Sequence, residues 1–189
     1  MPNDIYSKYP DVFDSTHWGN IECEVFETIK PIVSLKIKSK LMSELISELN
    51  EKITAKYFKR LYGKNVVKCA TNDNDPDITI GNFPLEIKVA KRTISGIAAW
   101  RGGTFSKREG DFIFIVWDFI DNLFEYSVYT CYLTKNDWQV SKYNNYYATN
   151  YNLKLMRNNP TYRNIVGDIV LSKRNIPKPQ LVNLCHTEN

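Results

Sequence analysis

A short segment near the middle of the chain has the pattern of a tight β-hairpin. Two apolar, β-branched runs, 77–80 and 84–90, flank Gly81-Asn82, a pair suited to a two-residue turn. With the turn centred there, Asp77 faces Glu86, because directly opposed residues share one face of a sheet with Cβ atoms about 5 Å apart. The hairpin therefore predicts two carboxylates held close together on one face.

Strand alternation adds a positive charge to that face. Lys88 points the same way as Glu86, whereas Ile87 points to the other side. Opposed like charges destabilise a sheet unless something offsets them, and Mg²⁺, which takes one or two carboxylates and keeps several waters, would do so. We expect Asp77 and Glu86 to bind Mg²⁺ and Lys88 to stabilise negative charge or help deprotonate a water. The alternative is a solvated hairpin with a surface ion pair.

The order Pro76-Asp77, eight residues, then Glu86-Ile87-Lys88 resembles the motif of the PD-(D/E)xK nuclease superfamily. The resemblance covers residues 40–130, and the chain looks most like a small type II restriction endonuclease. It implies sequence-specific, Mg²⁺-dependent hydrolysis of double-stranded DNA that leaves a 5′-phosphate and a 3′-hydroxyl, with Asp77 and Glu86 as metal ligands and Lys88 as the catalytic lysine. Cutting both strands of a palindromic site also implies a homodimer.

The surrounding pattern predicts an α/β fold with a mixed central β-sheet flanked by helices, the order of the restriction-endonuclease-like core. A long helix is expected over 38–62, with Gly63 as its stop and an apolar stripe formed by Leu41, Leu45, Leu49, Ile53 and Tyr57. Residues 1–20 are expected to be irregular, and 21–30 to form a short helix that ends near Pro31. Besides the hairpin, strands are expected at 65–70, 112–118 and 123–133.

The long helix offers a third acidic side chain. Many members of the superfamily add a glutamate from the helix before the sheet, and Glu51 is our choice. It shares a stripe that should face a packed surface with Ala55, Phe58 and Tyr62. Glu44 and Glu48 lie on the same stripe and are rivals. The alternative role for Glu51 is an exposed ion pair with a lysine of the same helix.

A basic segment follows the hairpin, and it is interrupted by Gly102-Gly103 and the aromatic Trp100. Lysine and arginine contact phosphates, and arginine also reads guanine edges. We expect DNA contacts from five residues of this segment: Lys91, Arg92, Arg101, Lys107 and Arg108. The alternative is a soluble, charged connection between two strands.

Composition sets the remaining expectations. The chain has 189 residues and a net charge of +4, which permits but does not require nucleic-acid binding. We expect one nuclease domain, with a core over 38–133 and an appendage over 134–189 for DNA recognition or dimerisation. The four cysteines have no metal-ligand spacing, and neither a signal peptide nor a membrane span is visible, so a cytoplasmic protein with no membrane association is expected.

Two other functions are compatible with the sequence. A structure-specific nuclease of the same superfamily, of the Holliday-junction or mismatch-nicking type, would have the same active site but read DNA by shape. A non-catalytic DNA-binding protein would carry the hairpin acids as surface charges.

Overall fold

The structure, a computed structural model, describes residues 5–33, 35, 37–72, 75–92, 100–102, 109–120, 123–140, 146–148, 158–166 and 174–175. Its helical elements are α1 (Ile5–Lys8), η1 (Pro10–Phe13), α2 (Ser15–Val33), α3 (Ser39–Tyr62) and η3 (Lys135–Asp137). Its strands are β1 (Val67–Cys69), β2 (Ile78–Ile80), β3 (Phe83–Lys91), β4 (Trp100–Gly102), β5 (Gly110–Ile120), β6 (Leu123–Leu133), β7 (Trp138–Val140), β8 (Tyr146–Ala148), β9 (Arg163–Asn164) and β10 (Arg174–Asn175).

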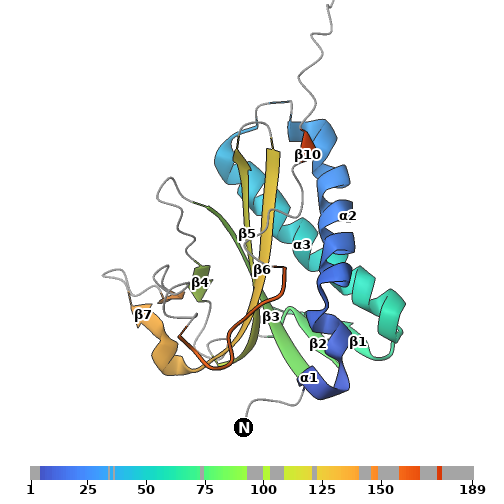
Figure 1. Ribbon diagram of the computed structural model, residues 1–189, viewed down its shortest axis with the longest axis vertical. Coiled ribbons are helices and arrows are strands. Elements are labelled where there is room, and N and C mark those ends of the chain that lie inside the picture. Colours follow the sequence, from blue (N-terminus) through green and yellow to red (C-terminus); the bar gives the residue numbers. More distant parts are fainter. Residues whose placement is uncertain are drawn as a thin grey trace, which may run out of the picture.

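The main sheet is mixed, as predicted. Its strand order is β1-β2-β3-β5-β6-β10, and β9 also pairs with β6. Strands β3 and β5 are parallel, whereas the other pairs are antiparallel. The long helices α2 and α3 lie on one side of this sheet, and a small sheet with the order β4-β8-β7 lies on the other side (Figure 1). The α/β class expected from the sequence is confirmed.

Helix α3 begins and ends where the sequence predicts. Gly63 follows it with φ 96°, a left-handed conformation that favours glycine and stops the helix. Of the predicted stripe, Ile53 is buried and Leu45, Leu49 and Tyr57 pack against the core partly buried, but the most buried positions are offset from the predicted leucines. Leu41 is 56% exposed, and the buried apolar residues of α3 are Met42, Ile46, Ile53, Ala55 and Phe58.

The first 33 residues contain more helix than the sequence predicts. Helix α2 begins at Ser15 and continues past Pro31, and short helical elements precede it. Asp14 accepts a hydrogen bond from the Thr16 N–H at 2.6 Å, which satisfies a free amide of the first turn. Pro31 lies in the last turn, where the N–H that proline lacks removes one intrahelical hydrogen bond near the end of the helix. Burial of one face stabilises α2 along its whole length. The buried residues of this face are Trp18, Ile21, Val25, Phe26 and Ile29.

The run Phe112–Trp117 in β5 is buried on both faces of the sheet, as its continuous apolar pattern predicts. Alternate residues join two clusters. Ile113, Ile115 and Trp117 pack with α2 and α3 in the larger cluster. Phe112, Phe114 and Val116 pack on the opposite face with Trp138 and part of β6.

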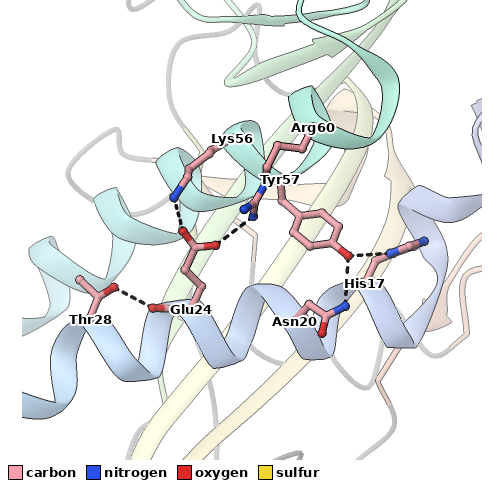
Figure 2. A network of polar contacts seen from close by, with 7 residues as sticks. All are labelled: His17, Asn20, Glu24, Thr28, Lys56, Tyr57 and Arg60. Carbon is pink, nitrogen blue, oxygen red and sulfur yellow. Dashed lines mark hydrogen bonds and ion pairs between the residues drawn. The ribbon is translucent and has the colours of Figure 1, made fainter.

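Polar contacts align α2 with α3 along their exposed sides (Figure 2). Glu24 accepts hydrogen bonds from Lys56 at 2.5 Å and Arg60 at 3.0 Å. Nearer the start of α2, the Tyr57 hydroxyl contacts His17 Nδ1 at 2.8 Å and accepts a hydrogen bond from the Asn20 amide at 3.1 Å. These contacts link α2 to α3 at two points along their length, while the buried cluster packs the two helices together.

The hairpin turn supplies a stability prediction. Gly81 has φ 61°, and a Cβ added there would collide with the Tyr9 hydroxyl, so Gly81→Ala should destabilise the protein by about 1–2 kcal/mol. Gly19, inside α2, has open space where the methyl group of an alanine would lie, so Gly19→Ala should stabilise by about 0.5–1 kcal/mol. Urea unfolding of the two variants measures whether the free energy of unfolding falls for Gly81→Ala and rises for Gly19→Ala. Equal changes in the two variants would contradict the turn geometry.

Candidate functional site

The β2–β3 hairpin has the register that the sequence predicts. Ile80 pairs with Phe83, and Ile78 pairs with Leu85, around the turn at Gly81. Strand β2 begins at Ile78, while β3 continues as far as Lys91. Beyond Leu85, therefore, the β2 side of β3 is an edge, and Asp77 stands at its start.

Asp77, Glu86 and Lys88 meet at this edge. The Ile87 N–H donates to Asp77 Oδ2 at 2.8 Å, which places the Asp77 carboxylate against the backbone of β3. The Asp77 N–H lies 3.4 Å from Glu86 Oε2, and Lys88 Nζ donates to Glu86 Oε1 at 2.5 Å. The structure thus gathers the two acids and the amine that the motif predicts.

The ion pair in this group is buried, unlike the solvated hairpin considered from the sequence. The Glu86 side chain is 8% exposed and the Lys88 side chain 17%. By the register of β3 with β5, Glu86 lies beside Phe112 and Lys88 beside Phe114, both in the cluster away from the long helices. Removing two charges from water costs free energy that even close pairing offsets only in part, so the sheet holds this pair at a cost that a surface ion pair would not carry.

A hydrogen-bonded loop positions Asp77. Asp75 accepts hydrogen bonds from the Thr71 N–H at 2.9 Å, the Thr71 hydroxyl at 2.6 Å and the Asn72 amide at 3.0 Å. The Thr71 bonds lower the pKa of Asp75, which keeps this carboxylate ionised as an acceptor. The Ala70 N–H also donates to the Asp77 carbonyl at 3.2 Å. Sequence reasoning missed Asp75, although an Asp after Thr and Asn is a usual signal of such a turn.

Glu51 is the third acid that the sequence predicts for this site. Glu51 is half-buried on α3, and α3 packs on the face of the sheet opposite to Glu86. Among the described residues, no three His, Cys, Asp or Glu side chains gather closely enough to hold a metal ion. The rivals are exposed: Glu44 pairs with Lys40 at 3.8 Å and Glu48 with Lys52 at 2.5 Å. The role of Glu51 in the site stays a prediction.

The donor set at the edge suits Mg²⁺. Asp77 and Glu86 provide hard carboxylate oxygens from two neighbouring strands, and Mg²⁺ is commonly bound by one or two carboxylates with water completing its shell. Glu86 Oε1 already accepts a hydrogen bond from Lys88, so a metal bound to Glu86 would compete with Lys88 for that oxygen or share it with Lys88. The arrangement therefore fits a cation that keeps most of its waters.

Lys91 and Arg92 lie away from the site. Lys91 is five residues beyond Glu86 along β3, or about 16 Å in an extended strand. Its ammonium is 3.8 Å from Asp118, and Arg92 is 3.3 Å from Glu125, so both cations have carboxylate partners within the sheet.

The other predicted DNA contacts are only partly placed. Arg101 lies in β4, which pairs with β8, but its side chain is outside the described residues. Lys107 and Arg108 are outside the described residues altogether, as is most of the predicted appendage.

A comparison of the sequence with models of known protein families finds no match, and no curated protein matches it either. None of the helices in the described part of the chain combines the length and apolar character needed to cross a bilayer. Function is therefore inferred from the geometry of the site.

Proposed function

We propose that the protein is a Mg²⁺-dependent, sequence-specific endonuclease that hydrolyses phosphodiester bonds of double-stranded DNA as a homodimer. One observation supports this most strongly: Asp77, Glu86 and Lys88 meet at the edge of β3, within hydrogen-bonding distance of one another or of the backbone between them. That set combines oxygen ligands for a hard cation with an ammonium for an anionic substrate.

Each residue has a distinct part in this proposal. A bound Mg²⁺ would activate a water and neutralise charge on the scissile phosphate. Asp77 and Glu86 would hold the ion, and the Ile87 N–H orients the Asp77 carboxylate. Lys88, paired with Glu86, would stabilise negative charge on the phosphate or orient the attacking water. The buried surroundings strengthen these charge interactions.

Digestion of plasmid DNA tests the proposal. With Mg²⁺, discrete fragments with 5′-phosphate ends are expected, and chelation with EDTA should stop the reaction. Nicking, or cutting confined to cruciform DNA, would favour a structure-specific nuclease of the same superfamily. Unchanged DNA with intact binding would reject catalysis and leave a DNA-binding protein.

A further inference from the structure

A cavity of about 530 Å³ lies outside the hairpin site, between the second half of α3 and the start of the sheet. Besides Ala55, it is lined by five cationic residues and one thiol: Lys52, Lys56, Lys59, Arg60, Lys64 and Cys69. Its size falls within the roughly 300–1,000 Å³ range of ligand pockets. None of these residues belongs to the Asp77 site.

The walls and the rim of this cavity differ in character. Ala55 and the aliphatic stems of the lysines supply apolar wall, because lysine packs its methylene groups while the ammonium stays in water. A cleft with one sign of charge and low-dielectric walls concentrates its field on a ligand of opposite charge. The cavity therefore suits a ligand with a flat apolar body and more than one negative charge.

The positive charge at the rim is only partly offset. Glu24 pairs with Lys56 and Arg60, and Glu48 with Lys52, in exposed contacts of the kind that contribute little and exchange readily. Among the described residues, neither Lys59 nor Lys64 has a carboxylate within ion-pair distance. Lys59 Nζ instead lies 2.8 Å from the Cys69 sulfur, a weak acceptor.

The geometry points to a nucleotide site: we propose that this cavity binds a phosphate-bearing nucleotide, with the base against the lysine stems and Ala55 and the phosphate near Lys59 and Lys64. Lysine is a common phosphate ligand, acting as a point charge. The nucleotide is either free or part of a polynucleotide strand. Position favours the second source, because Cys69 pairs with Ile78, which follows Asp77. Binding does not depend on the proposed cleavage.

Protection of Cys69 from alkylation provides the test. Iodoacetamide labelling at pH 8, mapped by peptide mass spectrometry, should modify exposed Cys69 in the free protein. Buried Cys131 is the internal reference, because burial raises its pKa to about 11 and keeps its thiol protonated. Saturating ATP or a single-stranded dT oligonucleotide should slow Cys69 labelling at least about tenfold if the cavity is filled. Protection by ATP identifies a free nucleotide, and protection by the oligonucleotide alone identifies a strand.

A charge-matched pair of double variants decides the location. Lys59→Gln with Lys64→Gln removes two cations from the rim and should weaken the protecting ligand about tenfold or more. Lys30→Gln with Lys40→Gln removes the same charge from exposed lysines that do not line the cavity, and it should leave affinity within about twofold. The proposal is overturned if neither ligand protects Cys69, or if both double variants weaken protection equally.

Discussion

Replacing Asp77 by Asn is expected to lower the rate of Mg²⁺-dependent DNA cleavage by at least about 100-fold, because the variant removes one of two anionic ligands from the proposed metal site. The fold should survive. The side-chain oxygen of Asn can still accept the hydrogen bond that the Ile87 N–H gives to Asp77 at 2.8 Å. Single-turnover digestion of plasmid DNA, with the melting temperature measured in parallel, separates the two effects.

Asp118→Asn is the matched control. Asp118 lies in the same sheet and also accepts a backbone hydrogen bond, from the Phe119 N–H at 2.8 Å, but it pairs with Lys91 at the far end of β3. Its variant should cleave within about twofold of the unmodified protein, since a charge at the far end of β3 has only a small effect on the site. Cleavage by Asp77→Asn at the unmodified rate would reject the assignment of the site.

Replacing Phe58 by Ala should have the second large effect, on stability. Phe58 is fully buried on α3 and contacts the rings of Trp18, Tyr57 and Tyr62. Truncating a buried Phe costs about 3–5 kcal/mol, as lost transfer free energy and as the cavity left behind. For a chain of this size that corresponds to a melting temperature lower by about 6–20 °C.

Leu61→Ala is the control on the same helix. Leu61 is 40% exposed, so its truncation should change the free energy of unfolding by less than about 0.5 kcal/mol. Urea unfolding measures both variants. If they lose equal stability, the packing of α3 against the sheet is not as described.

The hairpin shows how much of the site could be predicted. Its register depended on one turn, and a two-residue turn at Gly81-Asn82 determines which residues oppose one another. Asp77, Glu86 and Lys88 therefore came together from local rules alone. Glu51 could not be placed in the same way, because its distance from the hairpin depends on how α3 docks, which no local pattern specifies.

The helices show the same limit. The length of α3 followed from its apolar spacing and from Gly63, whereas its buried stripe was offset by one residue from the predicted leucines. Both stripes have helical spacing, and only contact with α2 and the sheet distinguishes them. In the sequence, the only sign of the cationic cavity is a repeat of lysines and an arginine along α3. The same repeat is equally expected if these cations pair with glutamates of the helix.

Sequence by itself determined the features set by neighbours along the chain: the β2–β3 turn and its register, the extent and end of α3, and the doubly buried run of β5. Tertiary structure decided the rest: the continuation of α2 through Pro31, the burial of the Glu86–Lys88 pair, and the contact of Lys59 with Cys69. The physical reason is the distance along the chain over which each kind of interaction acts. Turn and helix preferences act over a few residues, whereas burial and charge clustering depend on surfaces that meet only after the chain has folded.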